Sequence, residues 1–344
     1  MRPLDGLLGV GPCGLPPTPQ VPVGTSPPAP TLGGMSTPST AHALTAAPCV
    51  PTPGTVDHPA EPSGVPPWVG SVVAGLVDGP VSWSFPEQGL SGASCAIVKS
   101  GRTELFVKWL NPSAGREAAG MLACEARAYA RVAAVPDIPA LVAFDAGVLI
   151  TRAVTANPLA CWDAQTLRRA GGTLKALSQV GGSGLARVQD RPRFRDLPQA
   201  GRTAVVAATR GDRALARYLL ACYDGMCAWP DGEDDVTCHG DAHPGNWILT
   251  GAGPALIDLG HLALGPAGFD EAFLATYLNA PTRARLAWLR AAGVDFTLAA
   301  TVAGACCVRV ALRLVPLEDP SPPGRAWATQ IWPATLGLAR ALAR

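Results

Sequence analysis

Charge is scarce in this sequence, and it is almost evenly balanced between the two signs. Only 15% of the 344 residues are charged, and 27 Lys and Arg against 26 Asp and Glu leave a formal net charge of +1. Binding to a nucleic-acid backbone takes a surplus of clustered cations, so this composition argues against a nucleic-acid partner. A polybasic membrane anchor is disfavoured for the same reason.

Long apolar runs and regularly spaced cysteines are also missing. The most membrane-like run, Phe296 to Val308, has 13 residues before Arg309, whereas a helix needs about 20 to cross a bilayer. We therefore expect a buried helix there. The N-terminus lacks the apolar core of about 7 to 15 residues that a signal peptide needs, and the ten cysteines show no recurring spacing, unlike a disulfide framework. These absences predict a reduced, cytoplasmic protein with no membrane partner.

Proline, in contrast, is plentiful and unevenly distributed. Seventeen of the 35 prolines lie in residues 1–67, which hold only four charged residues. A segment of this composition has too little apolar patterning to offset the conformational entropy that ordering costs. We therefore predict a disordered Pro-rich tail over residues 1–67, which takes no part in the chemistry, and a folded part formed by the remaining 277 residues.

The apolar patterns of the remaining chain change from strand-like to helix-like. Short or alternating apolar runs predict strands at 81–85, 95–99, 103–109, 141–144 and 148–154, with a hairpin turn at 100–102. Helical spacing predicts helices at 113–134, 163–180, 202–229, 269–279, 282–292, 296–314 and 326–343. This order favours an α+β fold with two lobes: a small antiparallel-sheet lobe over residues 68–154 and a mostly helical lobe over residues 155–344.

Glu125 lies in the middle of the apolar stripe of the helix predicted at 113–134. The apolar positions that follow helical spacing around it are Met121, Leu122, Ala128, Tyr129 and Val132. A carboxylate on such a face is rarely buried without a partner. The chain has only three lysines, and one of them, Lys108, lies near the end of a predicted strand. We therefore expect an ion pair between Lys108 and Glu125.

The most informative stretch is Cys238-His-Gly-Asp-Ala-His-Pro-Gly-Asn-Trp-Ile-Leu249, followed by Ala255-Leu-Ile-Asp-Leu-Gly260. Two short apolar strands bracket a turn between these segments and place Asn246 and Asp258 at the two mouths of one hairpin. A carboxamide and a carboxylate form an all-oxygen pair that suits Mg²⁺ bridging phosphate oxygens. Asp241 lies five residues before Asn246 on an irregular loop, where it is placed to accept a proton from a substrate hydroxyl.

These residues resemble the catalytic loop and the metal-binding turn of the aminoglycoside phosphotransferase family. The similarity rests on His239-Gly-Asp241 with four residues before Asn246, and on Ile257-Asp258-Leu-Gly260. That family is related to choline kinases and, more distantly, to protein kinases, whose catalytic loop keeps the same interval between Asp and Asn. The resemblance therefore implies a protein-kinase-like fold, in which the sheet lobe binds the nucleotide and the helical lobe carries the catalytic loop and the acceptor site.

The resemblance extends on both sides of the loop, over roughly residues 80–280. Phe106-Val-Lys108 is similar to the strand that ends in the phosphate-contacting lysine. Glu125 stands 17 residues later, where the family places the ion-pair partner of that lysine. Downstream, Gly265 and Asp270 match the family's Gly-Asp-Pro-x-x-Asp segment, although Pro266 replaces its first Asp.

The resemblance implies transfer of the γ-phosphoryl group of ATP to a hydroxyl of a small molecule, such as an antibiotic, an amino alcohol, a sugar or a biosynthetic intermediate. Phosphoryl transfer depends mainly on positioning and charge neutralisation. In this scheme Lys108, aligned by Glu125, holds the α- and β-phosphates. Asn246 and Asp258 bind Mg²⁺, and Asp241 orients and deprotonates the acceptor.

Two further segments complete the nucleotide site that the resemblance implies. The loop 88–94 loosely matches a phosphate-binding loop through Gly89, Ser91 and Gly92. Residues 151–154 correspond to the hinge between the lobes, where the backbone groups of Thr151 and Ala153 would meet the adenine.

Two other functions stay open on the residues alone. His239, Asp241 and His243 alternate like metal ligands, and Asp258 or His261 could complete the site of a metallohydrolase. That alternative leaves the expected lysine–glutamate pair and the asparagine without roles. The second alternative is a kinase-fold binding protein without activity, which the intact set of catalytic residues disfavours.

The other polar residues of these segments are expected to have supporting roles. We expect His239 to hold the catalytic loop, His243 and His261 to be non-catalytic, and the acidic residues of 231–235 to form a solvated turn. The helical lobe is not conspicuously acidic, which disfavours an aminoglycoside as the acceptor. We expect a monomer or a weak dimer.

Overall fold

The structure of the protein is a computed structural model that describes residues 55–58, 64–86, 93–110, 115–191, 194, 197–230, 232, 234–315 and 322–344. All of these residues belong to one compact unit, Leu44–Arg344. Most of the predicted tail lies outside the described residues, and so do the predicted phosphate-binding residues Gly89, Ser91 and Gly92.

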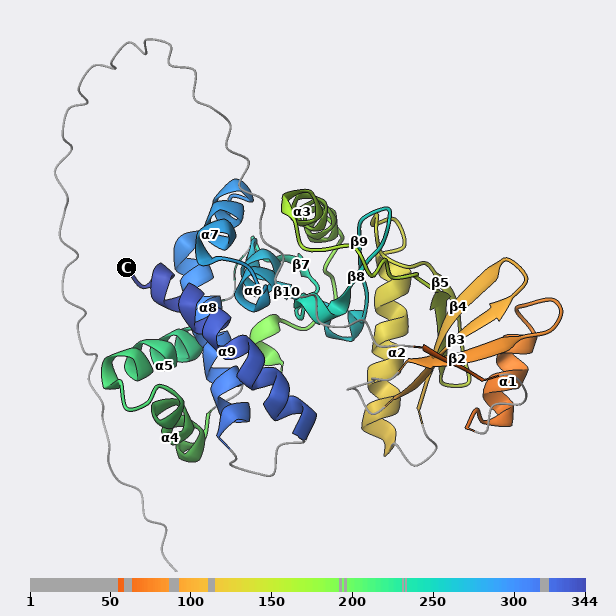
Figure 1. The fold of residues 1–344 in the computed structure, drawn as a ribbon, viewed down its shortest axis with the longest axis horizontal. Helices are drawn as coiled ribbons and strands as arrows, with labels where there is room; N and C mark the ends of the chain where they lie inside the picture. The colour runs from red at the N-terminus through yellow and green to blue at the C-terminus, as the bar shows by residue number, and fades with distance from the viewer. Residues whose placement is uncertain are drawn as a thin grey trace, which may run out of the picture. The chain divides into compact units, whose positions relative to one another are not determined.

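Strands dominate the first half of the described chain and helices the second half, as an α+β fold requires (Figure 1). The strands are β1 (Thr55–His58), β2 (Ser82–Pro86), β3 (Ser94–Ser100), β4 (Thr103–Trp109), β5 (Leu141–Asp145), β6 (Val148–Arg152), β7 (Val236–Cys238), β8 (Trp247–Leu249), β9 (Pro254–Leu256) and β10 (Ala263–Gly265). The helices are α1 (Pro67–Ala74), α2 (Gly115–Arg131), α3 (Ala164–Ser178), α4 (Gln199–Ala208), α5 (Arg213–Cys227), α6 (Phe269–Tyr277), α7 (Thr282–Ala291), α8 (Phe296–Leu314) and α9 (Pro322–Leu342).

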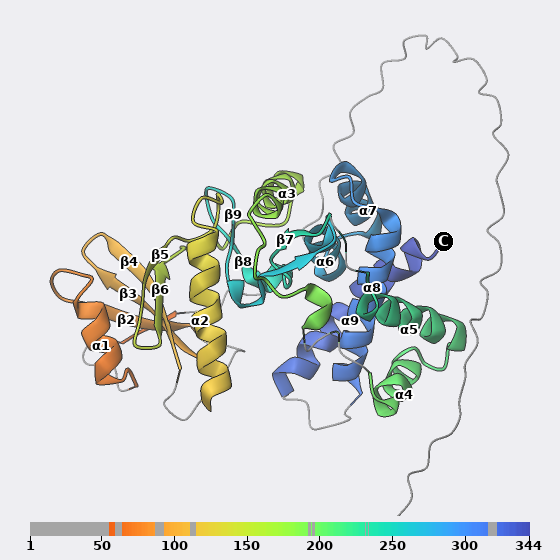
Figure 2. The same ribbon diagram turned by 180° about the vertical axis from the view of Figure 1, so that it is seen from behind.

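The sheet lobe is an antiparallel sheet in the order β1-β2-β3-β4-β6-β5. Side chains of a strand point alternately to its two faces. Leu105, Val107 and Trp109 therefore share one face of β4, where they join the apolar cluster formed with α1. Lys108 lies on the other face, toward α2, which packs between the sheet and the β8–β9 hairpin in both views of the ribbon (Figures 1 and 2). Strand alternation thus directs Lys108 to the side where the chemistry lies.

The helical lobe is built around α8. This helix contacts α5, α6 and α9, and its residues belong to the larger of the two apolar clusters. It has the length and apolar character of a membrane-spanning helix, but most of it is buried inside the protein. The predicted buried helix at Phe296–Leu314 is therefore confirmed.

The structure corrects two details of the predicted helices. The single helix predicted at 202–229 is two helices, α4 and α5, because Arg210 and Gly211 have φ values of 55° and 80° and break the helical path. Asp212 then starts α5 by accepting a hydrogen bond from the N–H of Leu215 at 3.0 Å, as an N-cap does. In α2, Met121 is 52% exposed and does not belong to the buried stripe, although its neighbour Leu122 does.

Four of the described strands and helices, β1, α1, β7 and β10, have no counterpart among the predicted ones. β1 lies inside the segment predicted as a tail and pairs with β2, which lies outside it, and α1 covers one face of the sheet. The other two, β7 and β10, form a short antiparallel pair that closes the base of the catalytic loop, because Cys238 and Ala263 lie opposite each other. β7 and β10 have only three residues each and are not joined by a short turn, unlike β8 and β9, so the sequence pattern does not reveal them.

Candidate active site

Lys108 lies at the centre of a cluster of three charged side chains from separate segments. Its Nζ is 2.8 Å from Oε2 of Glu125 on α2 and 3.1 Å from Oδ1 of Asp258, which follows β9. Glu125 is 17 residues and Asp258 is 150 residues away in sequence. We call these residues the lysine cluster. The predicted ion pair between Lys108 and Glu125 is present, and the structure adds Asp258 to it.

Burial and charge act against each other within the lysine cluster. Burial alone would lower the pKa of Lys108, but the charges of Asp258 and Glu125 outweigh it, so the pKa is raised and the ammonium stays charged. Burial raises the pKa of Glu125 to about 7 despite the lowering effect of Lys108. Burial also acts to raise the pKa of Asp258, but Lys108 outweighs it and the pKa is lowered. Of the two carboxylates that share this cation, Asp258 therefore keeps its negative charge more firmly.

The catalytic loop, residues 239–246, is tied at its start to a buried carboxylate. Asp270, in the first turn of α6, accepts hydrogen bonds from the backbone N–H of His239 at 2.5 Å and of Gly240 at 3.0 Å. Gly240 has a φ of 76°, and a Cβ at this position would overlap the carbonyl oxygen of His261, so only glycine fits here. Asp270 thus fixes the path of the chain just before Asp241.

His239 has the structural role that the sequence predicts. Its Nδ1 accepts the N–H of Asp241 at 3.2 Å, so the proton of the neutral ring lies on Nε2, which donates to the carbonyl of Ile257 at 2.9 Å. Burial lowers the pKa of His239, and the neutral ring that results suits this pattern of one acceptor and one donor. His239 therefore joins the catalytic loop to the strand that leads to Asp258.

Asn246 and Asp258 lie at the mouth of the hairpin formed by β8 and β9, as the sequence predicts. The N–H of Ile257 donates to the carbonyl of Asn246 at 2.9 Å, directly below the register pair of Trp247 and Leu256. Asn246 also donates from Nδ2 to the carbonyl of Asp241 at 2.8 Å. One hydrogen-bonded unit therefore contains the asparagine, the candidate base and the chain next to Asp258.

The donor set at this mouth fits Mg²⁺. Because the Nδ2 group of Asn246 is committed to Asp241, the oxygen of its side chain is the atom left to face a cation. Asp258 contributes a carboxylate that keeps its charge and is 38% exposed. Hard oxygen ligands of this kind, completed by phosphate oxygens and water, are what Mg²⁺ prefers.

Asp241 lies between two histidines at the surface of the loop. Its Oδ2 is 3.9 Å from Nε2 of His243 and 4.0 Å from Nε2 of His261, and its side chain is 20% exposed. Beyond His243, the ring of Tyr277 follows at 6.2 Å between centroids. Asp241 is therefore partly accessible, as a base must be in order to reach a hydroxyl.

The hinge residues lie at the end of β6, an interior strand of the sheet. Thr151 belongs to β6 and pairs with Phe106 of β4, while the N–H of Ala153 donates to the carbonyl of Glu104 at 3.0 Å. The backbone N–H of Ala153 is thus used within the sheet lobe. A contact from Ala153 to the adenine, which stays a prediction, would therefore come from its carbonyl group.

The arrangement does not favour the metallohydrolase. The ring nitrogens of His239 bond to backbone groups, and Nδ1 of His243 accepts the N–H of Gly245 at 3.0 Å. Within the part of the chain that the structure describes, no group of three or more His, Cys, Asp or Glu side chains could hold a metal ion.

The predicted solvated turn at 231–235 needs a correction at one residue. Asp235 is not solvated, because its side chain is only 7% exposed and accepts from Arg187 at 3.0 Å. Asp234 is exposed, while Asp231 and Glu233 lie outside the described residues.

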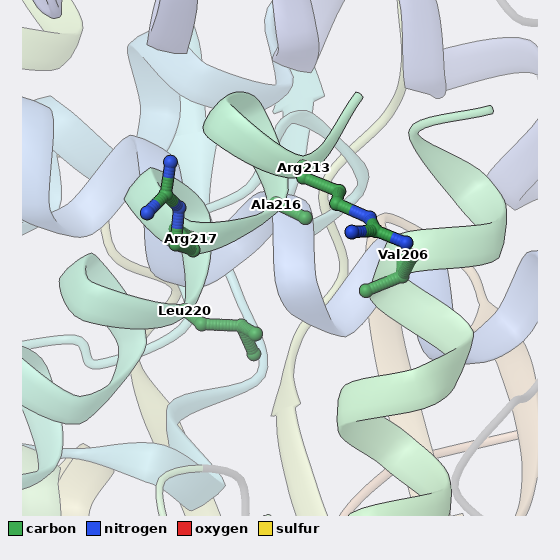
Figure 3. Close-up of a pocket in the computed structure, with 5 residues that line it drawn as sticks. All are labelled: Val206, Arg213, Ala216, Arg217 and Leu220. Carbon is green, nitrogen blue, oxygen red and sulfur yellow. The ribbon is translucent and has the colours of Figure 1, made fainter. Parts of the chain in front are cut away.

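A cavity of about 440 Å³ lies between α4 and α5, away from the lysine cluster and the catalytic loop (Figure 3). Its lining residues are Val206, Arg213, Ala216, Arg217 and Leu220. None of them belongs to the lysine cluster or to the catalytic loop, so the cavity is separate from the chemistry.

The sequence does not predict the roles of two site residues, Asp270 and Tyr129. Asp270 matches a family segment, but its two hydrogen bonds to the catalytic loop are seen only in the structure. Tyr129 was placed only in the apolar stripe of α2, yet its hydroxyl accepts the backbone N–H of Asp258 at 3.2 Å. Helical spacing could have indicated that Tyr129 lies near the site, because it follows Glu125 by four residues and so shares its helix face.

Solved structures share the fold of this chain at low sequence identity. A spectinomycin phosphotransferase in complex with ADP and spectinomycin has a TM-score of 0.56 and 13% identity, over 78% of this chain and 94% of that chain. A choline kinase from Cryptosporidium parvum Iowa II has a TM-score of 0.53 and 11% identity, over 79% of this chain and 95% of that chain. A macrolide 2′-phosphotransferase from Brachybacterium faecium has a TM-score of 0.50 and 17% identity, over 78% of this chain and 99% of that chain. The chain therefore has the predicted kinase-like fold.

The family of the chain follows from comparison of its sequence with family models. No curated protein sequence matches the chain. Residues 82–302, which are more than half of the chain, match the model of the phosphotransferase enzyme family. This range contains the lysine cluster, the catalytic loop and the β8–β9 hairpin, so the residues that carried the resemblance lie inside the match. The chain belongs to the phosphotransferase enzyme family.

Proposed function

We propose that the protein is a cytoplasmic enzyme that transfers the γ-phosphoryl group of ATP to a hydroxyl of a small molecule. The observation that carries the proposal is the contact of Lys108 with both Glu125 and Asp258, at 2.8 and 3.1 Å. This contact joins a cation for phosphate oxygens to the carboxylate of the Mg²⁺ site. The proteins of similar fold support it, since they are named for the phosphorylation of spectinomycin, choline and macrolides.

Each residue of the site has a defined task in this reaction. Lys108 binds phosphate oxygens of ATP, and Glu125 keeps its ammonium in place. Asn246 and Asp258 hold Mg²⁺, which neutralises charge on the phosphate oxygens when it is bound. In such a transfer the protein acts mostly by positioning and by electrostatic stabilisation.

Asp241 accepts the proton of the acceptor hydroxyl in our scheme. Its backbone N–H is bonded to His239 and its carbonyl to Asn246. These two bonds fix the backbone on both sides of Cα, so that the Cα–Cβ bond has a defined direction. The proton moves from the hydroxyl to the carboxylate as the hydroxyl oxygen forms its bond to phosphorus and ADP leaves.

The test is a screen of ADP release with hydroxyl compounds as acceptors. Wild-type protein, ATP and MgCl₂ are incubated with antibiotics, amino alcohols and sugars, with Asp241→Ala as the blank. We expect at least one acceptor for which the wild type releases ADP at least a hundredfold faster than Asp241→Ala. General-base catalysis typically contributes a factor of about 10² to 10⁴.

The matched control is Asp145→Ala, which removes an exposed aspartate at the end of β5. It should release ADP at the wild-type rate. Phosphorylation by Asp241→Ala at the wild-type rate would remove Asp241 from the mechanism. If ATP binds but no acceptor is phosphorylated, the result favours the kinase-fold binding protein.

A further inference from the structure

Asp258 has an unusual backbone for a residue with a side chain. Its φ and ψ are both 61°, in the left-handed region, where non-glycine residues are uncommon. Such a conformation persists when the surrounding structure holds it. The residue therefore needs contacts that favour this backbone over the alternatives.

Tyr129 supplies such a contact from α2. Its hydroxyl oxygen accepts the backbone N–H of Asp258 at 3.2 Å, and its side chain is only 5% exposed. Burial raises the pKa of Tyr129, so the phenol stays neutral. A buried backbone N–H without a partner is costly, and thus this bond favours the observed position of Asp258.

Helix α2 consequently acts on Asp258 at two points. Glu125 reaches the side chain of Asp258 through Lys108, and Tyr129, one helical turn later, reaches its backbone. The turn after Asp258 packs closely on the same helix face, because a Cβ at Gly260 would lie 3.8 Å from Oε2 of Glu125. The two contacts together define both the place and the direction of the carboxylate.

We infer that Tyr129 is a positioning residue for the Mg²⁺ site. It holds the backbone of Asp258 in the left-handed conformation that directs the carboxylate to the cation. The inference rests on the proposed function, because it takes Asp258 as a ligand of Mg²⁺. It predicts that loss of the Tyr129 hydroxyl weakens the response to Mg²⁺ and leaves the contact of Lys108 with the nucleotide unchanged.

The test measures ATP binding and needs no acceptor. Isothermal titration calorimetry gives the Kd of ATP in EDTA and at increasing MgCl₂, for wild type and Tyr129→Phe. The Kd in EDTA should change less than twofold. The MgCl₂ concentration that produces half of the tightening should rise about tenfold, or about 1.4 kcal/mol, because the variant leaves the buried N–H of Asp258 without its acceptor.

Tyr218→Phe is the matched control. It removes a phenol of α5 that contacts the carbonyl of Ala339 at 3.5 Å, far from the lysine cluster in sequence. A general loss of stability would lower the melting temperature of both variants, but it would not move the MgCl₂ midpoint. If Tyr129→Phe does not fold, Tyr129→Met is used under the same criterion, because methionine also lacks the acceptor and adapts to irregular space.

Asp258→Asn separates the two ways in which the inference can fail. If Asp258→Asn abolishes the Mg²⁺-dependent tightening and Tyr129→Phe has the midpoint of Tyr218→Phe, the role of Tyr129 is wrong and the proposed function stands. If ATP binding tightens normally in Asp258→Asn, or does not respond to Mg²⁺ in the wild type, the metal assignment of the proposed function fails and the inference fails with it.

Discussion

The catalytic loop and the lysine cluster are held in opposite ways. In the loop, hydrogen bonds connect groups that are close in sequence, such as Asn246 with Asp241, and one distant carboxylate, Asp270, accepts two backbone N–H groups. In the lysine cluster, one cation contacts two carboxylates from distant segments, and only side chains meet. The loop is thus a scaffold held mainly by hydrogen bonds of its backbone, whereas the lysine cluster is one cation shared by two carboxylates.

This difference predicts which property each region controls. A change in the scaffold leaves buried backbone groups without partners, so it lowers the free energy of unfolding. A change in the cluster removes charge from the place where phosphate oxygens would bind, so it lowers nucleotide affinity. Three predictions test this contrast.

The largest effect is expected for Asp270→Ala. The variant leaves the buried N–H groups of His239 and Gly240 without their acceptor. At about 1 to 3 kcal/mol for each donor, the free energy of unfolding should fall by about 2 to 6 kcal/mol. Urea denaturation of wild type and variant at pH 7 measures this loss.

Asp212→Ala is the control for Asp270→Ala. Asp212 also accepts a backbone N–H, that of Leu215 at the start of α5, and loss of such a cap costs about 1 kcal/mol. Equal losses in the two variants would mean that Asp270 is an ordinary helix-terminal carboxylate. The catalytic loop would then have to be held by other contacts.

The same contrast explains what could be predicted from the sequence. Asn246 and Asp258 were placed correctly at one hairpin mouth, since strand pairing and a short turn determine their separation. The pairing of Lys108 with Glu125 follows from helix periodicity, which places Glu125 on the buried face, and from the scarcity of lysine, since the chain has only three. The family resemblance supplied the order of the segments.

Other features could not be read from local patterns. The contact of Lys108 with Asp258 depends on the packing of α2 against the turn that follows β9, over 150 residues of sequence. The hydrogen bond from the backbone N–H of Asp258 to the hydroxyl of Tyr129 depends on the left-handed backbone of Asp258, which no sequence pattern predicts. The side chain of Asp235, expected in water, is only 7% exposed and pairs with Arg187, which lies 48 residues earlier in the chain but next to it in space.

The second prediction concerns pH and again probes the scaffold. Burial raises the pKa of Asp270 from 3.8 to about 7, although its two backbone donors favour the charged form. The folded state therefore binds the proton more tightly than the unfolded state. The resulting stabilisation is complete below about pH 4 and is lost as the pH rises through about 7.

Asp270→Asn isolates this titration, because the amide keeps one acceptor and does not ionise. The free energy of unfolding of the wild type, minus that of the variant, should decrease between pH 4 and pH 7, by at most about 4 kcal/mol for a shift of this size. Titrations of groups that do not interact with Asp270 cancel in the difference, whereas that of Glu271, whose charge also raises the pKa of Asp270, contributes to it. A difference that increases with pH would show that the two N–H donors dominate over burial and hold the carboxylate ionised.

The third prediction addresses the cluster and has the smallest expected effect. Lys108→Met removes a buried cation, and ATP should bind about a hundredfold more weakly, since truncation of one member of a buried charged pair costs about 2 to 5 kcal/mol. Lys99→Met is a matched control from the same sheet, because Lys99 lies on β3, is 53% exposed and pairs with Glu104 at 3.3 Å. Exposed pairs contribute about 0 to 1 kcal/mol, so Lys99→Met should bind ATP like the wild type. Calorimetry at a temperature where circular dichroism shows both variants folded gives the two affinities. Equal affinities would mean that Lys108 only neutralises Glu125 and Asp258, in which case the cluster is a second scaffold and its difference from the loop disappears.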